Sequence, residues 1–573
     1  MSQHIIFLVL RRMRRPLIAL IFVYAIATLG LTLIPGQDPE GNVWYMSFFH
    51  AFYFVSFMGS TIGFGEIPYP FTDHQRYWVL FCIYTSVIAW LYTIGTLLSL
   101  LQDASFKQAV TVQQFSHAIA KLRSPFFIIC GYGDTGKTLT KELSSMGYSV
   151  VVLDRDPDSL IYLPLDDFNT PVSSLVCDVS IPENLVNAGL LNPYCQAIVA
   201  LTDHDHTNLK VAVTSKSMEP GLLTVCRAQE ESEIANLKSF DTDVICNPNE
   251  IFANRLVDSI KKPAIDSITR YVISQYSEHQ TNNNDELPPS GTWIICGYGL
   301  FGKTVKAHLD AAKIPCVIIE EEHIGKQLPD DVIHGTGTEA HTLEKAGIQH
   351  AAGLIAGTQD DANNLSILLT AQALNPAIYT IGRLNQKHNR ALYNGAKLNA
   401  IFRDHQVMAD SILTRLTRPM VTHFLKQLDK LSEKQAQELQ ENINLLEHGE
   451  QLITWRLVLS DKTSPAISGL LKNEKVIRIA DLQKNLQLPS NKQKTASLCL
   501  LIKRAGHYKI APESSTTLQQ YDQLLFCGNK DTINDLQQIS QDIELLDNQL
   551  DPSLHSIPLF RWYTRKFAIK STS

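Results

Sequence analysis

The sequence predicts a membrane-embedded all-α region, followed by two α/β domains of the Rossmann-like type and a small α+β lobe. Three observations predict this order. Residues 17–34 and 77–101 contain no Asp, Glu, Lys or Arg, and each stretch is long enough to cross a bilayer as a helix. A strand, glycine loop and helix pattern occurs twice, 166 residues apart. Short strand-like runs then follow at 452–459, 496–502 and 523–527.

The composition excludes several classes of protein. The chain has 573 residues, which is enough for several domains, and a formal charge of -7. The chain lacks the overall positive charge that would indicate a nucleic-acid partner. The ten cysteines are scattered without a CxxC motif, which argues against a disulfide scaffold or a zinc site and favours a reducing compartment for most of the chain.

The first apolar stretch is expected to be a transmembrane helix with a cytoplasmic N-terminus. Residues 17–34 lie between Pro16 and Pro35 and would extend about 27 Å as a helix. Arg11, Arg12, Arg14 and Arg15 come directly before this stretch, and such clusters are retained on the cytoplasmic side. Residues 77–101 then return the chain to the cytoplasm as a second span.

The uncharged segment between the two spans is expected to be re-entrant. A third span at 43–64 would put residues 102–573, with nine of the cysteines, outside the cell. Non-helical backbone at membrane depth is tolerated where protein buries it or where it lines a water-filled path. The segment therefore indicates a pore.

The re-entrant segment ends in Thr61, Ile62, Gly63, Phe64 and Gly65, which resembles the TVGYG filter of potassium channels. Glycines at alternate positions let successive carbonyls turn toward one axis, where they replace the hydration shell of an ion. The alternative is a glycine-containing turn between two apolar helices. Residues 1–103 resemble the outer helix, pore helix, filter and inner helix of two-span potassium channels, with K+ at residues 61–64.

Acidic residues surround the expected outer mouth of the pore. Glu66 follows the filter directly, and Asp38, Glu40 and Asp73 lie in the neighbouring segments. A ring of such carboxylates would concentrate cations. The alternative interpretation is ordinary solvated loop charge.

The two glycine loops carry a dinucleotide-binding pattern. Each has an apolar strand, a GxGxxG motif, a helix and a second strand that ends in an acid, with Asp154 or Glu320 placed 23 residues after the first glycine. The glycines allow a tight turn and the approach of a pyrophosphate to a helix N-terminus, and the acid binds ribose hydroxyls. The motif glycines are Gly131, Gly133, Gly136, Gly297, Gly299 and Gly302.

Both loops also fit the P-loop pattern GxxxxGKT through Lys137 and Lys303. The acid at the end of the next strand and the additional glycine in each loop favour the dinucleotide fold. A phosphate-binding role for the lysines stays open and would widen the ligand to ATP, ADP or AMP. NAD(H) is expected first, because a carboxylate would repel the 2′-phosphate of NADP(H).

The duplicated region resembles tandem RCK (regulator of potassium conductance) domains. The copies correspond further at Asn208 and Asn364 and at Arg227 and Arg383, and the two arginines are candidate ligand-binding residues. The resemblance implies a ligand-binding role for Asp178, whereas the second copy has Thr336 at that position. The run 203–206 (Asp-His-Asp-His) could hold a divalent cation such as Ca2+, although a solvated loop is the alternative. No nucleophile with an adjacent base and no acid/base pair accompanies either loop, so enzyme chemistry is not indicated.

The resemblance implies a potassium-selective channel in a prokaryotic inner membrane, gated by a ligand and built as a homotetramer with eight RCK domains in a cytoplasmic ring. The alternatives are a nicotinamide-dependent membrane oxidoreductase and a regulatory subunit of a cation transporter. The expected boundaries are a pore domain at 1–103, a gating linker at 104–124, RCK domains at 125–280 and 291–435 with a linker at 281–290, a C-terminal lobe at 436–545 and a tail at 546–573.

Overall fold

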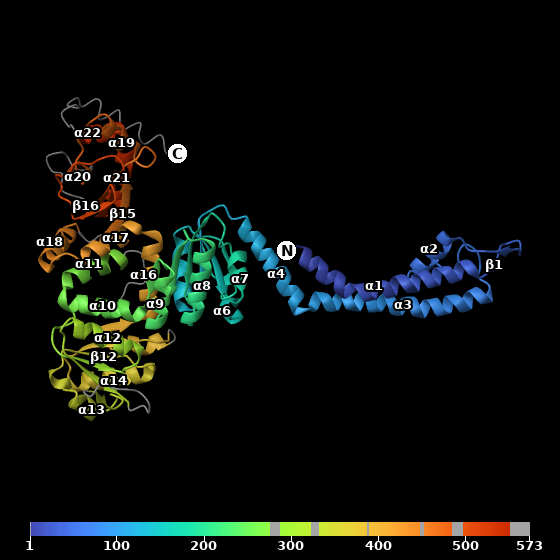
Figure 1. Ribbon diagram of the computed structural model, residues 1–573, viewed down its shortest axis with the longest axis horizontal. Helices are drawn as coiled ribbons and strands as arrows, with labels where there is room; N and C mark the ends of the chain where they lie inside the picture. Colours follow the sequence, from blue (N-terminus) through green and yellow to red (C-terminus); the bar gives the residue numbers. More distant parts are fainter. Residues whose placement is uncertain are drawn as a thin grey trace. The chain divides into compact units, whose positions relative to one another are not determined.

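The computed structural model describes residues 2–274, 287–321, 332–386, 389–446, 452–483 and 497–550. Most of the expected linker at 281–290 and the tail beyond residue 550 lie outside these ranges. The chain divides into two compact units (Figure 1). The first contains residues 1–123 and 186–192, and the second contains the other described residues.

The first unit is helical. Its helices are α1 (Ser2–Leu33), α2 (Phe48–Gly59), α3 (Asp73–Gln102) and α4 (Ala104–Ala120), with a two-stranded ribbon of β1 (Gly36–Gln37) and β2 (Val43–Trp44). Two stretches, Val9–Leu33 and Asp73–Gln102, are long and apolar enough to cross a membrane. The expected spans are thus confirmed as helices, and the segment between them contains one helix, the short apolar α2, besides the β1–β2 ribbon.

Helix α1 begins earlier than the sequence predicts. It continues through Pro16 and includes the arginine cluster, because a proline removes one helical hydrogen bond and bends a helix without necessarily ending it. Helices α1 and α3 pack along each other (Figure 1). Gly30 permits a close approach, since a Cβ there would lie 2.1 Å from the ring of Trp78. The indole nitrogen of Trp78 donates to the carbonyl of Ala27 at 3.2 Å.

The second unit opens with a six-stranded parallel sheet in the order β5-β4-β3-β6-β7-β8. This is the strand order of a doubly wound nucleotide-binding fold. The strands are β3 (Phe126–Cys130), β4 (Ser149–Asp154), β5 (Val172–Val176), β6 (Cys195–Ala200), β7 (Leu223–Arg227) and β8 (Val244–Cys246). The helices are α5 (Asp134–Ser145), α6 (Pro157–Ile161), α7 (Pro182–Asn187), α8 (Asp205–Met218), α9 (Glu231–Ser239), α10 (Pro248–Lys261) and α11 (Pro263–Ser274).

The second copy repeats this sheet in the order β11-β10-β9-β12-β13-β14. Its strands are β9 (Trp293–Cys296), β10 (Cys316–Glu320), β11 (Ile333–His334), β12 (Gly353–Ala356), β13 (Tyr379–Arg383) and β14 (Ala400–Phe402). Its helices are α12 (Leu300–Ala311), α13 (Ala340–Lys345), α14 (Asp361–Leu374), α15 (Arg390–Asn394) and α16 (Asp404–Thr417). The predicted pair of Rossmann-like domains is confirmed.

The two copies exchange the helix that directly follows their last strand. Helix α10 leaves the first sheet and packs on α12 of the second copy, while α16 leaves the second sheet and packs on α5 of the first. Ile412 and Leu413 of α16 are buried in one core with Leu139 and Leu143 of α5. Leu256 of α10 lies in the core of the second copy. Each copy therefore completes its apolar core with a helix from the other.

A small lobe follows the second copy. It has an antiparallel sheet in the order β15-β18-β16-β17. Its strands are β15 (Ile453–Val458), β16 (Ser497–Arg504), β17 (His507–Ile510) and β18 (Gln523–Gly528). Its helices are α17 (Pro419–Leu428), α18 (Glu433–Asn444), α19 (Pro465–Lys472), α20 (Ile479–Leu482), α21 (Lys530–Gln541) and α22 (Ile543–Leu550). The three strand-like runs of the sequence are β15, β16 and β18, whereas β17 was not predicted.

Candidate functional sites

The TIGFG segment leaves helix α2 with an alternating backbone. Thr61, Gly63 and Gly65 have positive φ angles of 62°, 67° and 99°, whereas the two residues between them do not. Alternation of left-handed and ordinary residues turns successive peptide planes so that their carbonyls can point the same way. A Cβ at Gly63 or Gly65 would meet no atom within 4 Å of this chain, so the backbone conformation, and not crowding within the chain, requires glycine at these positions.

Glu66, which follows this segment, is not an isolated charge. Its Oε1 accepts from Nε of Arg76 at 2.9 Å, and its Oε2 accepts from Nη2 of Arg76 at 3.2 Å and from the backbone N–H of Phe71 at 2.8 Å. These hydrogen bonds hold the pKa of Glu66 below its usual value, and the bonds from Arg76 make the largest contribution to this shift. The carboxylate thus ties the end of the filter-like segment to the first turn of α3.

The first glycine loop lies at the carboxyl edge of the first sheet, where a pocket of about 260 Å3 opens. Gly131, Gly133, Asp154 and Asp178 all line it. Gly136 does not line the pocket. A Cβ at Gly136 would lie 2.2 Å from the carbonyl oxygen of Gly131, so this glycine serves the close packing of helix on loop.

The acids that end β4 and β10 hold their glycine loops. Oδ2 of Asp154 accepts the backbone N–H of Tyr132, and Oε2 of Glu320 accepts the backbone N–H of Tyr298. A carboxylate oxygen has two lone pairs, so these contacts leave acceptor capacity for ribose hydroxyls. Asp178 accepts the backbone N–H of Ser180 at 2.8 Å, and this bond lowers its pKa.

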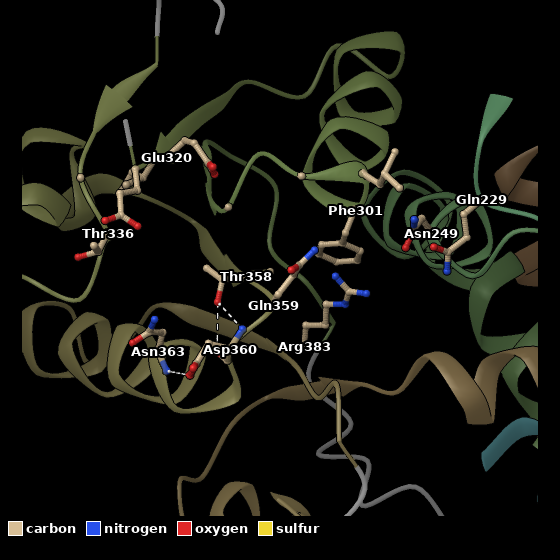
Figure 2. A pocket seen from close by; sticks show the side chains of 17 residues that line it. Gln229, Asn249, Phe301, Glu320, Thr336, Thr358, Gln359, Asp360, Asn363 and Arg383 are labelled. Carbon is tan, nitrogen blue, oxygen red and sulfur yellow. Dashed lines mark hydrogen bonds between the residues drawn. The ribbon is translucent and has the colours of Figure 1, made fainter. Parts of the chain in front are cut away.

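The second glycine loop lines a larger pocket of about 470 Å3, which Figure 2 shows from close by. Gly297, Gly299, Glu320 and Arg383 line it, together with Thr336 at the position of Asp178. Gly302 again lies behind the loop, since a Cβ there would be 1.9 Å from the oxygen of Gly297. The two pockets thus match in their loops and differ in the residues around them.

Gln229 and Asn249 of the first copy also line the second pocket. Asn249 is 2% exposed, and its Oδ1 is buried without a hydrogen-bond partner in the described part of the chain. Sequence reasoning missed both residues, because Asn249 on α10 and Gln229 after β7 belong to the first copy and line a site that is distant along the chain. Neither residue belongs to a motif that could have revealed it.

An asparagine that both copies share holds the rim of each site. The side chain of Asn208 accepts from the N–H of Thr202 at 3.0 Å and donates to the carbonyl of Arg227 at 3.0 Å. Asn364 makes the same bonds to Thr358 and Arg383, at 2.9 Å and 3.1 Å. The recurrence of Asn208 as Asn364 in the second copy was the sequence signal for this pair of hydrogen bonds.

The remaining candidates have local partners. Nζ of Lys137 lies 5.8 Å from the ring centroid of Tyr132, and Nζ of Lys303 lies 5.6 Å from that of Tyr298, so both lysines contact an aromatic ring and line neither pocket. Arg227 pairs with Asp203 at 2.8 Å and does not line the first pocket. Among the described residues, no group of three or more His, Cys, Asp and Glu could hold a metal ion, including the run 203–206.

Comparisons with known proteins agree with this division of the chain. The TrkA-N domain model matches residues 127–248 and 293–404, and the ion channel model matches residues 18–103. Potassium channel protein 1 of Methanocaldococcus jannaschii is 25% identical over 221 residues, which cover 39% of this chain and 62% of that protein. Probable potassium channel protein 2 of the same organism is 25% identical over 333 residues, covering 56% of this chain and 91% of that protein.

The extent of these matches differs among relatives. The chain spans 34% of the length of a matching uncharacterized protein of Methanothermus fervidus, and less than two thirds of potassium channel protein 1. A solved structure of the GsuK channel has a TM-score of 0.46 and 17% identity, and the match covers 92% of this chain and 99% of that chain. Residues 18–103 thus match the ion channel family and residues 127–248 and 293–404 match the TrkA-N family, so the chain combines an ion-channel-like region with a tandem pair of TrkA-N-like regions.

Proposed function

We propose that this protein is a potassium-selective channel that is gated by a ligand bound to its TrkA-N domains. The alternating backbone of residues 61–65, between two apolar helices, carries the proposal. Such a segment presents carbonyl oxygens that replace the hydration shell of K+. The match to the ion channel family and the names of the two Methanocaldococcus relatives support the same reading.

The pore is proposed to form between four copies of the chain, with eight TrkA-N domains in a ring. One chain supplies a single row of carbonyl oxygens, whereas a ring of ligands around an ion requires such rows from several chains. Ile62 and Phe64 are 61% and 64% exposed in the single chain, and partner subunits would cover such apolar side chains. The proposed orientation has the N-terminus on the cytoplasmic side of a prokaryotic inner membrane, supported by the arginine cluster of α1. Two spans would return the chain to the same side, so the TrkA-N domains are also proposed to be cytoplasmic.

Adenine nucleotides are the proposed gating ligands, with NAD(H) first and ATP, ADP or AMP as the other candidates. Each pocket combines a glycine loop at a helix N-terminus, which is suited to binding phosphate, with a carboxylate that can accept hydrogen bonds from ribose hydroxyls. A ligand opens or closes the pore only if its affinity differs between the ring conformation of the open channel and that of the closed channel.

Flux through reconstituted vesicles tests the proposal. Purified full-length protein in liposomes should take up Rb+ and K+ far faster than Na+, and a nucleotide that binds should change the rate. Equal Na+ and K+ fluxes through intact protein would exclude the filter assignment. Calorimetry that detects no NAD(H), ATP, ADP or AMP binding at millimolar concentrations would exclude the nucleotide assignment and leave the filter assignment standing.

A further inference from the structure

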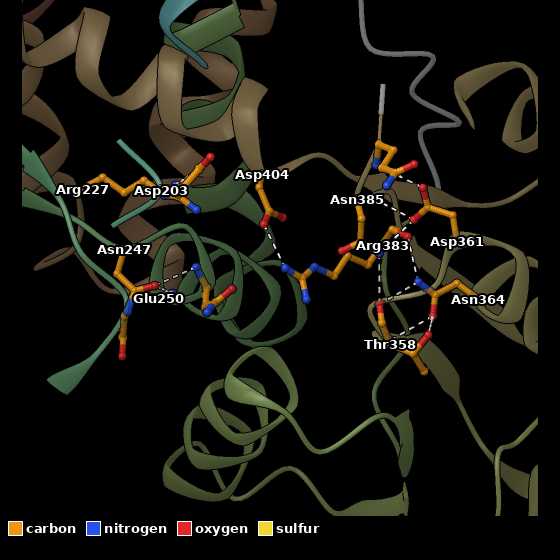
Figure 3. A network of polar contacts seen from close by, with 12 residues as sticks. Asp203, Arg227, Asn247, Glu250, Thr358, Asp361, Asn364, Arg383, Asn385 and Asp404 are labelled. Atoms are coloured by element: carbon orange, nitrogen blue, oxygen red, sulfur yellow. Dashed lines mark hydrogen bonds and ion pairs between the residues drawn. The ribbon is translucent and has the colours of Figure 1, made fainter. Parts of the chain in front are cut away.

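The second pocket contains an arginine that is shared between the pocket and a helix of the exchange. Nη2 of Arg383 donates to Oδ2 of Asp404 at 3.0 Å, and Arg383 lines the pocket whereas Asp404 does not. Figure 3 shows this ion pair between the end of β13 and the start of α16. The guanidinium also lies 5.0 Å from the ring centroid of Phe301, so the arginine is oriented by two groups.

The ion pair is largely buried and incompletely satisfied. The side chains of Arg383 and Asp404 are 16% and 26% exposed. Nε of the arginine and Oδ1 of the aspartate are both buried without a hydrogen-bond partner in the described part of the chain. A guanidinium has five N–H donors in a fork that fits a phosphate with two parallel bonds, so a phosphate in the pocket would satisfy it better than one carboxylate oxygen does.

Asp404 connects the arginine of this pocket to a helix that packs on the first copy. It is the first residue of α16, which packs on α5, and α5 begins directly after Gly133 of the first glycine loop. A change in how the start of α16 is held therefore acts on the helix that carries the first nucleotide site. Gln229 and Asn249 already bring residues of the first copy into the second pocket.

The first copy has no corresponding connection. Arg227, the counterpart of Arg383, pairs with Asp203 (Figure 3), whose side chain is 92% exposed and lines the first pocket itself. The residue that opens α10, at the place of Asp404, is the uncharged Pro248. The two sites thus differ in whether their arginine pairs with the helix that packs on the other copy.

We propose that Arg383 is a positioning residue with two partners, and that the phosphate groups of a ligand in the second pocket draw it away from Asp404. Ligand binding at the second site is thereby coupled to the first site through α16, and this coupling is reciprocal. Arg227, paired with Asp203, supplies no second connection of this kind. This inference rests on the proposed nucleotide binding. It adds that phosphate, and not the nucleoside, is the part of the ligand that the switch detects.

Removal of the Asp404 charge tests the switch in the full-length protein. The first site is blocked by Gly133→Leu, and ADP and adenosine are titrated by calorimetry into the protein in lipid nanodiscs. Asp404→Asn should raise the ADP affinity by about fivefold, because the carboxylate no longer competes for the guanidinium. The adenosine affinity should stay unchanged. Asp461→Asn, which removes an ion-paired carboxylate from the C-terminal lobe, should change neither.

A double-mutant cycle separates the switch from a structural effect. Arg383→Gln should lower the ADP affinity, and Asp404→Asn should then have no further effect in that background. Asp404→Glu, which keeps the charge, should restore behaviour close to the wild type. If Asp404→Asn does not fold by thermal melting, Asp404→Ser serves in its place, since serine is also accepted at the start of a helix.

Three results would overturn the inference. They are an unchanged ADP affinity in Asp404→Asn, an equal change for ADP and adenosine, and the same effect of Asp404→Asn with and without Arg383. In each of these cases ADP still binds to the protein, and the proposed function stands. An absence of any nucleotide binding to the wild type would instead overturn the proposed function, and this inference with it.

Discussion

The guanidinium of Arg76 holds the carboxylate of Glu66 through two hydrogen bonds, from Nε to Oε1 and from Nη2 to Oε2. A freely solvated carboxylate at the outer mouth would act mainly by attracting cations. A carboxylate that is held by an arginine on the following helix also fixes the position of the segment before it. Glu66 is therefore expected to influence the stability of the filter as well as its charge.

The pH dependence of conduction distinguishes these roles. The pKa of Glu66 is depressed, so the stabilisation by the pair is complete above the ordinary glutamate value and is lost as the pH falls through the lowered pKa. In Arg76→Gln, the midpoint of the acid-induced loss of K+ current should move up toward the ordinary value of about 4.3. The measurement is single-channel recording in planar bilayers with acidification of the outer side only. Identical midpoints in the two proteins would contradict the pairing.

Gly63→Ala should abolish selective current. The φ angle of Gly63 is 67°, and an alanine in that conformation costs about 1–2 kcal/mol and favours a rotated peptide. Rb+ uptake into liposomes should fall to background, while nucleotide binding stays unchanged. Gly41→Ala is the matched control, because Gly41 also has a positive φ of 84° with no atom near its Cβ position, and it lies outside the filter-like segment. Retained K+ selectivity in Gly63→Ala would rule out the filter.

Substitutions at the second and third glycines of the first GxGxxG motif should separate folding from binding. Gly136→Ala would place a Cβ 2.2 Å from a backbone oxygen, so the stability of the domain should fall by about 1–3 kcal/mol, seen as a lower melting temperature of the full chain. Gly133→Ala has open space and no positive φ, and it faces the first pocket. It should lower nucleotide affinity without lowering the melting temperature. The reverse pattern would mean that Gly133 is structural.

The acids at the strand ends should control the choice between NAD and NADP. Asp154→Asn and Glu320→Gln keep an acceptor for the loop N–H but lose the negative charge, so each should weaken NAD binding at its own site and reduce the discrimination against NADP. Calorimetry on the full chain with both dinucleotides measures the two affinities. Glu183→Gln, which lines neither pocket, is the control. Unchanged discrimination in both variants would remove ribose recognition from these acids.

The sequence predicted the strands and their acidic ends closely. A strand ending at Asp154 was expected, and it is observed at Ser149–Asp154. An unbroken apolar run that stops at a charged residue is typical of a buried parallel strand. The exchange of α10 and α16 could not be predicted in the same way. The pattern of a helix shows that one of its faces is covered, but it does not show which of two similar copies covers it.

Contacts that depend on the exchange or on a returning loop were also missed. Arg76 reaches Glu66 only because the intervening residues fold back, and Asn249 reaches the second pocket only because α10 crosses to the other copy. Neither arginine nor asparagine at such positions differs from an ordinary solvated residue when the sequence is read alone. Repeated residues such as Asn208 and Asn364 were the exception, since their recurrence pointed to a shared structural task.

The exchange of helices has a consequence for synthesis of the chain on the ribosome. The first sheet is complete once β8 has been made, but Ile412 and Leu413, which close its core, follow 166 and 167 residues after Cys246. At about 5–20 residues per second, they emerge roughly 8–33 s later. During that interval the apolar face of α5 has no cover from its own copy. A chain truncated between the copies would therefore keep the apolar face of α5 exposed, a feature that chaperones and proteases recognise.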